Sequence, residues 1–482
     1  MCGIFGFFGN TRNIHEIIEH SLEVLKHRGP DAFGVLLDNE IYYNVIPKIL
    51  DTDIFSCIIH LHLKITDETP QPLHNETRTL WLVHNGEIYN YNKLRDIMRP
   101  KHVFYTKSDS EALLHAFEEG NLSILDGNFA AAIYDSQRIK LTLIRDPIGI
   151  RPLFYGFDKN TFYFASEKKV LRRLCSRIYE LEPGNIIEIE RDGKINVQKF
   201  DSIVSWHITR IENFQIATSK LKDNLINAVR KRSYPNMGLL FSGGIDSLLI
   251  AEILRFLDKP VTLYTAGLED APDIQYASKI ADMLGYRLRI RLIDDDELED
   301  LVRKVIYAIE DPNPVHVTIG IPIFAASQLA RKDGIRVLLS GQGADELFGG
   351  YARYLKIQDK SLLEKTLLND LLNTYKNNLD RDDHCTMANS IEVRYPYLDK
   401  DVIKTAISIP IEFKIRNSTR KVILRKIGLE LGLPKDIVDR PKKAIQYGSR
   451  VTGMLKKMAK RYGGLRKFTQ KIYKECAEKA HG

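Results

Sequence analysis

Short runs of alternating or continuous apolar residues make up most of the first 200 positions, and they predict β-strands joined by turns. Only two segments, 13–29 and 108–120, have the apolar spacing of an amphipathic helix. The strand-like runs cover residues 34–46, 56–65, 79–90, 129–146, 162–167 and 184–200. Strands gathered around a few helices predict an α+β layered domain, to which we assign residues 2–205.

From about residue 215 the pattern changes to strands that alternate with helices. Strand-like segments occur at 236–244, 261–267, 286–294 and 334–341, and helical segments follow them from Asp246 and over 273–285, 296–310 and 345–351. Repeated units of this length predict a parallel sheet with helices on both faces. The stretch after Asp359 is mostly helical in pattern. We assign residues 215–482 to this α/β domain with a helical C-terminal part.

The composition is that of an ordinary globular protein, with 44% hydrophobic and 28% charged residues among 482. All apolar runs are shorter than the roughly 20 residues of a membrane-spanning helix, so we expect no membrane insertion. The chain start lacks the basic region of a signal peptide. Five scattered cysteines without a C-x-x-C pair indicate neither a disulfide framework nor a structural zinc site, and they predict a cytoplasmic protein.

The net charge of +7 is modest for this length, and much of the excess lies in residues 455–482. A solvated terminal helix is the favoured interpretation of this basic segment, ahead of a patch for nucleic acid or an acidic partner. We therefore expect small-molecule ligands and no nucleic-acid partner. The sequence does not decide between a monomer and a homodimer.

Cys2 follows the initiator methionine, which is normally removed before a small residue. The mature chain would then carry a thiol and a free α-amine on one residue. An α-amine titrates near ~8 and a thiol near ~8.5, so each can exchange a proton at neutral pH. This is the arrangement of an N-terminal nucleophile whose own amine acts as the base. The alternative is an accident of the start site.

The segment FSGGIDS at 241–247 follows a buried-looking strand and opens a helix. Ser242, Gly243 and Gly244 allow a tight turn whose N–H groups can bind phosphate at the positive end of the helix. The loop lacks the G-K-S/T ending of a Walker loop. With Asp246 and Ser247 it resembles the pyrophosphate loop of the ATP pyrophosphatase superfamily, whose members cleave ATP between the α- and β-phosphates.

A second loop, SGQGADELFGGY at 340–351, also follows a strand. Asp345 and Glu346 start a helix there, at the sheet edge where the first loop should present its phosphates. Carboxylate oxygens are the ligands that Mg²⁺ prefers, so the loop predicts a magnesium site. The alternative is that the two acidic residues only complement the helix N-terminus.

Further motifs occur in order along nearly the whole chain. The first half contains MCGI at the start, HRGPD at 27–31, NGEIYN at 85–90, SD at 108–109, LDGNFAAAIYD at 125–135, RDPIGIRPLFY at 145–155 and FASE at 164–167. The second half adds EVRYPYLD at 392–399 and RKVILRK at 420–426 to the two loops. Together they resemble the glutamine-dependent asparagine synthetase family. The resemblance implies an N-terminal-nucleophile glutaminase domain followed by an ATP pyrophosphatase domain of the adenine-nucleotide α-hydrolase type.

The resemblance also implies roles for residues of the first domain. Cys2 would attack the side-chain amide of glutamine, with its α-amine as the base. Asn85 and Gly86 match the oxyanion hole, in which one donor is typically worth ~3 kcal/mol of barrier. Glu87 and Asp109 match the carboxylates that hold the α-ammonium of glutamine, and His62 and Leu63 fall where its carboxylate is bound. Ammonia would pass through an internal channel to the second domain.

In the second domain the resemblance implies splitting of ATP with Mg²⁺ to AMP and pyrophosphate, amidation of aspartate to asparagine through an acyl adenylate, and no organic prosthetic group. Asp246 and Asp345 match the Mg²⁺–pyrophosphate positions, and Lys421 matches a lysine that reaches the phosphates. The positions that match adenosine-contacting residues are Phe241, Ala266, Ser340 and Gly341.

Three departures from the family pattern fall at substrate-recognition points. His62 stands where the family usually has an arginine that clamps the glutamine carboxylate, which predicts weaker capture unless Lys64 or an arginine substitutes. Gln342 stands where the authentic enzymes have a glutamate, and glutamine cannot act as a base. After Glu310 the Thr-Thr-x-Arg run is replaced by residues 315–318, VHVT.

Other functions are therefore kept open. A related amidotransferase or cyclase would adenylate a carboxylate other than aspartate. A tRNA-modifying enzyme would also use a pyrophosphate loop, but the glutaminase motifs argue against it. A storage or regulatory protein would not need Cys2, Asn85, Asp246 and Asp345 together.

Overall fold

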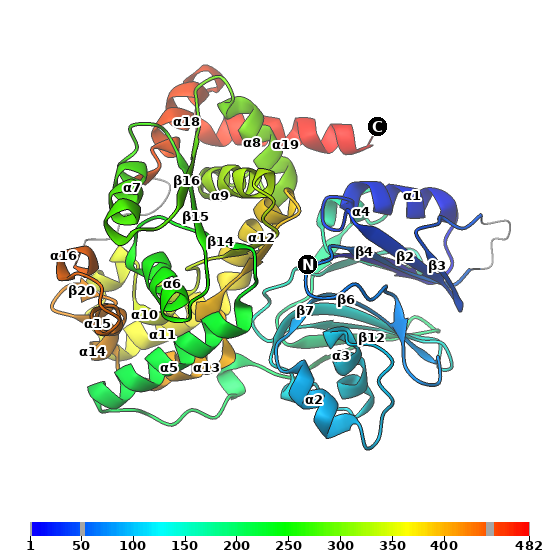
Figure 1. The fold of residues 1–482 in the computed structure, drawn as a ribbon. Helices are drawn as coiled ribbons and strands as arrows, with labels where there is room; N and C mark the ends of the chain where they lie inside the picture. The colour runs from blue at the N-terminus through cyan, green and yellow to red at the C-terminus, as the bar shows by residue number, and fades with distance from the viewer. Residues whose placement is uncertain (1, 49–53, 440–447, 482) are drawn as a thin grey trace. The chain divides into compact units, whose positions relative to one another are not determined.

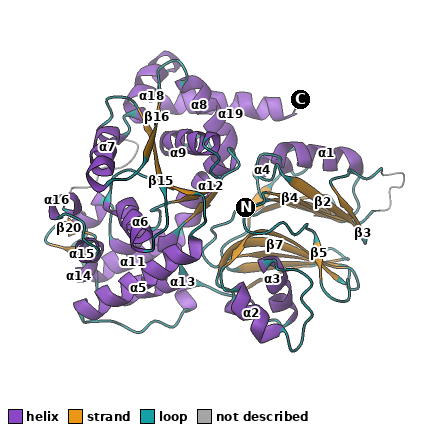
Figure 2. Cartoon of the chain, in the orientation of Figure 1, coloured by secondary structure: helices purple, strands orange, loops and turns teal. Residues whose placement is uncertain are grey.

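The chain divides after Ser205 into two units in the computed structural model, which describes residues 2–48, 54–439 and 448–481 (Figure 1). The N-terminal unit is built mainly of strands and the C-terminal unit mainly of helices (Figure 2). Among the described residues, every helix is too short or too polar to cross a membrane. The predicted fold class is confirmed, an α+β domain followed by an α/β domain.

One antiparallel sheet of the N-terminal unit has seven strands in the order β11-β9-β10-β1-β4-β2-β3. Its strands are β1 Gly3–Phe8, β2 Ala32–Leu37, β3 Glu40–Tyr43, β4 Ser56–His62, β9 Phe154–Asp158, β10 Thr161–Ala165 and β11 Ile178–Glu180. β1 lies inside the sheet, where Phe5 pairs with Ile59 of β4 on one side and with Ala165 of β10 on the other. The sheet therefore holds the start of the chain in a paired position.

A second antiparallel sheet has six strands in the order β13-β12-β8-β7-β6-β5. Its strands are β5 Leu73–His74, β6 Leu80–Ile88, β7 Gly127–Asp135, β8 Lys140–Arg145, β12 Asn185–Glu190 and β13 Ile195–Lys199. The runs predicted at 34–46, 129–146 and 184–200 each contain two strands that pair as a hairpin. The strand content of these runs was therefore predicted correctly, but the turn within each run was not assigned.

The two sheets pack face to face and carry helices on their outer faces (Figure 1). The helices are α1 Ile14–Leu25, α2 Tyr91–Met98, α3 Asp109–Glu118 and α4 Lys168–Leu171. Side chains of β1 point to both faces of the sheet and so belong to two hydrophobic cores. Phe5 and Phe7 pack against α1, and Ile4 and Phe8 pack between the two sheets. The prediction of only two helices was wrong, because α2 buries just Leu94 and Met98 and so has a short apolar signal.

The C-terminal unit contains a parallel sheet in the order β16-β15-β14-β17-β18. The strands are β14 Met237–Leu240, β15 Thr262–Gly267, β16 Leu288–Leu292, β17 Val337–Leu339 and β18 Glu392–Arg394, and β19 Ile415–Arg416 pairs with β20 Thr419–Arg420 in a separate hairpin. Connections move outward from β14 to β16 and then return to β17. Right-handed crossovers therefore place helices on both faces, as predicted.

Helices cover this sheet and form most of the chain after it. The longer ones are α5 Phe214–Arg232, α6 Ile245–Phe256, α7 Pro272–Leu284, α8 Leu298–Ile309, α9 Pro314–Lys332, α11 Lys360–Leu372, α12 Asp380–Met387, α13 Lys400–Ser408, α15 Val422–Glu430, α18 Val451–Ala459 and α19 Leu465–His481. Short ones are α10 Ala344–Phe348, α14 Ile411–Lys414 and α16 Lys435–Val438. The apolar core between the sheet and α8, α9, α18 and α19 fixes the strand ends from which the site loops project.

Candidate active sites

Cys2 lies directly before β1, and its side chain is 7% exposed. Its backbone nitrogen donates a hydrogen bond of 2.9 Å to Oδ1 of Asn85, in β6 of the other sheet. Its carbonyl oxygen accepts a hydrogen bond of 3.2 Å from Nε of Arg28. Both sides of the backbone at Cys2 are therefore held by residues of the predicted motifs NGEIYN and HRGPD.

Asn85 and Gly86 lie next to each other in β6. Asn85 is fully buried, and its Nδ2 makes no hydrogen bond to any described residue. A buried amide donor without a partner is costly, so it is available to a ligand beside Cys2. A Cβ atom at Gly86 would collide with the carbonyl oxygen of Asn128, so the close approach of these strands requires glycine here.

A buried ion cluster joins the motif HRGPD to the motif FASE. Arg28 donates to Oε1 of Glu167 at 2.9 Å, and Nε2 of His27 lies at the same distance from that oxygen. Lys169 lies 2.6 Å from the second oxygen, Oε2. Burial would raise the pKa of Glu167, but its cationic partners outweigh burial and hold the pKa well below its usual range. The cluster fixes Arg28, which in turn holds the backbone of Cys2.

Asp109 and Glu87 form a carboxylate pair near the start of α3. Oδ2 of Asp109 accepts a hydrogen bond of 2.7 Å from the backbone of Ile88. Burial, together with the charge of Glu87, raises the pKa of Asp109 to about 8. A cation placed beside two such carboxylates would relieve their repulsion. The pair therefore suits an ammonium group.

His62 ends β4 and is 8% exposed, with its ring centroid 5.3 Å from that of His60. Burial lowers the pKa of His62 to about 4, so the ring is neutral at pH 7 in the protein without glutamine. The next residue, Leu63, is buried. Lys64 directs its ammonium group to Glu68, at 3.8 Å. His62 therefore offers a hydrogen-bonding ring and no charge where the family pattern has an arginine.

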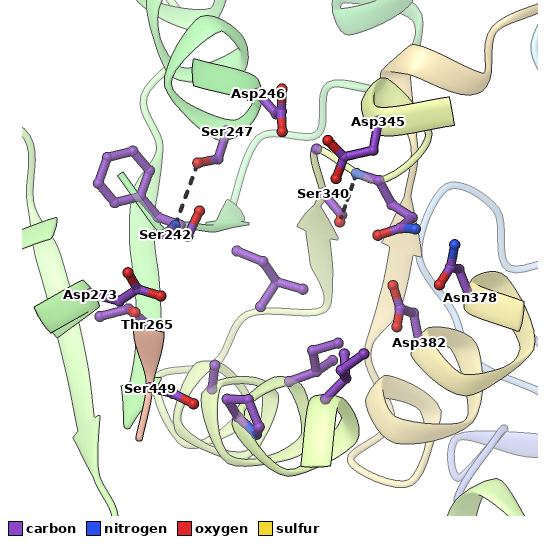
Figure 3. Close-up of a pocket in the computed structure, with 18 of the residues that line it drawn as sticks. Ser242, Asp246, Ser247, Thr265, Asp273, Ser340, Asp345, Asn378, Asp382 and Ser449 are labelled. Carbon is purple, nitrogen blue, oxygen red and sulfur yellow. Dashed lines mark hydrogen bonds between the residues drawn. The ribbon is translucent and has the colours of Figure 1, made fainter. Parts of the chain in front are cut away.

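In the C-terminal unit the loop from Phe241 to Gly244 connects β14 to α6. The hydroxyl group of Ser242 accepts a hydrogen bond of 3.4 Å from the backbone of Gly244. The hydroxyl group of Ser247 accepts one of 3.4 Å from the backbone of Ser242 (Figure 3). Gly243 has a φ of 70°, which glycine adopts without strain. The helix begins at Ile245, one residue before the prediction. The loop thus has the strand–turn–helix geometry of a phosphate-binding site.

Asp246, Asp345 and Lys421 meet at the edge of this loop. Nζ of Lys421 lies 2.5 Å from both carboxylate oxygens of Asp246 and 2.5 Å from Oδ1 of Asp345. Lys421 is 2% exposed and has a φ of 58°, at the start of α15. Two carboxylates that converge on one cation have the donor atoms that Mg²⁺ requires, so the residues fit that ion. Glu346 instead accepts hydrogen bonds from Tyr351 at 2.5 Å and Asn378 at 2.9 Å.

A cavity of about 440 Å³ opens beside the loop (Figure 3). The predicted residues that line it are Phe241, Ser242, Asp246, Ser247, Ala266, Ser340, Gly341, Gln342 and Asp345. Gly243 and Gly244 form the turn at its edge, and Lys421 reaches it through Asp246 and Asp345. The structure therefore brings the predicted residues of the C-terminal unit to one place.

Several cavity residues were missed by the sequence analysis, notably Arg381 and Asp382 of α12. Both are buried, and Arg381 contacts Oδ1 of Asp382 through Nε at 2.8 Å and through a terminal nitrogen at 2.6 Å. Thr265, Asp273 and Asn378 add further polar groups to the wall. The sequence carries no distinct signal for them, because the charged run DRDD at 380–383 is typical of an exposed helix, and only the structure shows that this helix is buried throughout.

The altered run VHVT forms the first turn of α9. Val317 is fully buried, Val315 is 54% exposed, and His316 bonds to Asp311 at 2.6 Å through Nδ1. The next turns of α9 line the cavity with apolar side chains, Ile319, Pro322, Ile323 and Ala326. The wall provided by α9 is thus apolar, and the polar wall is provided by α12.

Known proteins resemble both units. The sequence model for the glutamine amidotransferase domain matches residues 1–205, and the model for asparagine synthase matches residues 220–365 and 356–475. A Methanocaldococcus jannaschii protein, provisionally named glutamine-hydrolysing asparagine synthetase 1, is 38% identical over 96% of each chain. Glutamine-hydrolysing asparagine synthetase 3 of Arabidopsis thaliana is 31% identical over 86% of this chain and 72% of its own. Asparagine synthetase B of Escherichia coli is 30% identical over 93% of this chain and 82% of its own.

Proposed function

Because this chain belongs to the family of glutamine-hydrolysing asparagine synthetases, carbon–nitrogen ligases that use glutamine as amido donor, we propose that its own acceptor is aspartate. The overall reaction converts ATP, aspartate, glutamine and water to AMP, pyrophosphate, asparagine and glutamate. One observation carries the proposal. The phosphate-type loop with Asp246, Asp345 and Lys421 shares a cavity with the buried pair of Arg381 and Asp382.

The glutaminase half-reaction is assigned to Cys2. Its thiolate adds to the side-chain carbonyl carbon of glutamine, and the α-amine takes the thiol proton and later passes a proton to the departing ammonia. The Nδ2 group of Asn85 and the N–H of Gly86 would stabilise the developing oxyanion. Water then hydrolyses the thioester to glutamate. The buried Nδ2 of Asn85, which has no hydrogen-bond acceptor among the described residues, supports this assignment.

The two carboxylates of Glu87 and Asp109 are assigned to the α-ammonium of glutamine. Burial and the charge of Glu87 raise the pKa of Asp109, and the repulsion between the two carboxylates supports a bound cation. His62 and Leu63 would contact the α-carboxylate, with the neutral ring of His62 as a hydrogen-bond donor. Capture of that carboxylate is therefore expected to be weaker than with a charged guanidinium group.

ATP is assigned to the 440 Å³ cavity. The apolar side chains of α9, with Phe241 and Ala266, suit the adenine ring, and the loop from Ser242 to Gly244 suits the phosphates. Asp246 and Asp345 would hold Mg²⁺, which when bound neutralises phosphate charge. The acceptor carboxylate attacks the α-phosphorus, pyrophosphate leaves near Lys421, and ammonia displaces AMP from the acyl adenylate to form the amide.

Aspartate is assigned to the polar wall formed by α12. Its α-carboxylate and α-ammonium groups require opposite charges, and the neighbouring side chains of Arg381 and Asp382 provide one of each in a buried setting. A bidentate guanidinium group is well suited to a carboxylate. The β-carboxylate would then be directed toward the phosphates.

The test is ATP–pyrophosphate exchange by the full chain with a panel of carboxylates. Aspartate should stimulate exchange, while succinate, which lacks the α-ammonium group, and glutamate, which is one methylene longer, should not. Arg381→Gln should abolish the response to aspartate. Exchange that aspartate does not stimulate would refute aspartate as the acceptor.

A second candidate is amidation of a different carboxylate. Gln342 lines the cavity in the place of the glutamate of the authentic enzymes, which favours this alternative. A panel member other than aspartate would then stimulate exchange, and its amide would be the product.

A further inference from the structure

Four side chains with metal-binding atoms meet on the outer side of the N-terminal unit, away from the residues assigned above. They are Glu76, His102, His115 and Glu118, and one ligand atom from each lies within 4.8 Å of the others. Glu76 follows β5, His102 follows α2, and His115 and Glu118 lie one turn apart on α3. Three separate segments of the chain thus contribute to one cluster.

The spacing of these atoms matches a tetrahedral ion. Nδ1 of His102 lies 3.1 Å from a Glu76 oxygen and 3.8 Å from a Glu118 oxygen, and Nδ1 of His115 lies 2.8 Å from Glu118 and 3.9 Å from Glu76. Zinc bonds to nitrogen and oxygen are about 2.0–2.1 Å long, so ligand atoms around tetrahedral zinc are about 3.3 Å apart. The four ligand atoms lie within 4.8 Å of one another, so side-chain shifts of up to roughly 1 Å would complete the geometry.

The carboxylates also have partners outside the cluster. Oε1 of Glu118 accepts a hydrogen bond of 2.7 Å from Asn75, and Oε1 of Glu76, the oxygen that lies 3.1 Å from Nδ1 of His102, accepts one of 2.9 Å from the backbone of Val103. The Oε2 atoms are the ones that face Nδ1 of His115. The carboxylates are therefore oriented by outer partners before any ion is bound.

His102 is oriented in the same way. Its Nε2 lies 3.2 Å from a carboxylate oxygen of Glu119, whereas the buried Nε2 of His115 has no hydrogen-bond partner among the described residues. A carboxylate beside the far nitrogen keeps the proton there and leaves the lone pair of Nδ1 for a metal, a pattern typical of metal-binding histidines. The rings stack with centroids 4.3 Å apart, which places both Nδ1 atoms next to the same two carboxylates.

From this geometry we propose that Glu76, His102, His115 and Glu118 form a structural Zn²⁺ site. Two carboxylates and two neutral imidazoles neutralise the ion and fill all four positions, which is the closed arrangement of structural zinc. No structural zinc site was predicted from the sequence, because it has no paired cysteines. The proposed site has no cysteine ligands and uses only histidine nitrogen and glutamate oxygen atoms. It would join the segment after β5 and the segment after α2 to the end of α3, the helix that begins at Asp109. The inference does not depend on the proposed reaction.

The full chain, stripped of metal with a chelator, provides the test. It should bind one Zn²⁺ per chain by calorimetry, and Co²⁺ in the same site should give the intense visible absorption of tetrahedral coordination. Zn²⁺ should raise the unfolding temperature. Glu118→Gln keeps the side-chain shape but removes the anionic ligand, and it should abolish the Co²⁺ spectrum. Glu119→Gln, which changes only the outer partner of His102, should weaken Zn²⁺ binding about 10- to 100-fold.

His15→Ala is the matched control, because His15 and Glu19 form an exposed pair 3.3 Å apart that lies outside the cluster. This variant should bind Zn²⁺ like the unaltered chain. The proposal is overturned if the unaltered chain gives only a weak, octahedral Co²⁺ spectrum, or if Glu118→Gln binds Zn²⁺ as tightly as His15→Ala. Should Glu118→Gln fail to fold, His102→Gln and the spectrum of the unaltered chain decide the question.

Discussion

The backbone nitrogen of Cys2 holds the buried side chain of Asn85 in place, because it donates a hydrogen bond of 2.9 Å to Oδ1 of Asn85. This contact uses the acceptor end of the amide and leaves the donor end, Nδ2, without a hydrogen bond among the described residues. The proposed nucleophile therefore orients the proposed oxyanion donor before any substrate is bound. Preorganisation of this kind is the main source of electrostatic catalysis.

Replacement of Cys2 by alanine should abolish glutamine-dependent turnover and leave ammonia-dependent turnover intact, because ammonia bypasses the thiol. The measurement is product formation with each nitrogen source. Cys476→Ala, at the partly exposed cysteine of α19, is the control and should retain both activities. Loss of both activities in a folded Cys2→Ala protein, or of neither, would show that the assignment is wrong.

The KM for glutamine should fall as pH rises toward the pKa of Asp109, about 8. Burial and Glu87 keep Asp109 protonated below this pH, and only the ionised form attracts the α-ammonium of glutamine. Asp109→Asn should raise the KM and remove this pH dependence. Glutaminase rates over a pH series test the expectation, with ammonia-dependent rates as the control. An unchanged profile in Asp109→Asn would contradict it.

His62→Arg should lower the KM for glutamine roughly 5-fold, because a charged donor binds a carboxylate more strongly than a neutral one. The buried ring, with a pKa of about 4, is neutral throughout the working range, so the gain should be similar across neutral pH. His62→Ala provides the comparison. If neither variant changes the KM, His62 only packs beside His60 and another group holds the carboxylate.

ATP should be converted to AMP and pyrophosphate, since the loop before α6 lacks a Walker lysine and Lys421, just before α15, contacts Asp246 and Asp345 instead. Lys421→Met should reduce pyrophosphate exchange at least about 100-fold. Its control is Lys426→Met, on the same helix but part of a partly exposed pair with Glu430. ADP as the main nucleotide product would refute this prediction.

Glu167→Gln should destabilise the N-terminal unit by about 3–5 kcal/mol, because it removes the buried negative charge that faces Arg28 and Lys169. Denaturant unfolding measures the effect. Glu188→Gln, in a partly exposed pair with Lys140, is the control and should cost about 1 kcal/mol or less. The lowered pKa of Glu167 stabilises the fold above its unfolded value of 4.5, and this contribution disappears as pH falls through the folded value.

The fold class and most of the C-terminal site could be predicted because their signals are local. The loop from Ser242 to Ser247 can be recognised in the sequence by its glycine turn between an apolar strand and a helix. The same holds for the loop that contains Asp345. The turns within the hairpins were not assigned, although Asp38 and Asn39, two residues common in turns, separate the two strands of residues 34–46.

Other features depend on contacts between segments that are far apart in sequence. The neutral state of His62 results from its burial, which its sequence neighbours do not reveal. The pairing of Glu167 with Arg28 joins residues 139 positions apart. Arg381 and Asp382 belong to a helix whose polar pattern is typical of an exposed surface, and only the fold places them in a cavity wall.

The pairing of β1 has a consequence for synthesis on the ribosome. Phe5 needs Ile59 on one side and Ala165 on the other. At about 5–20 residues per second, the ribosome adds the residues up to Ala165 in about 10 to 30 s. During that interval the first strand lacks one neighbour, and the nascent end of the chain stays open to the enzymes that remove the initiator methionine. The proposed removal of the methionine would thus have this interval before the sheet that encloses Cys2 is complete.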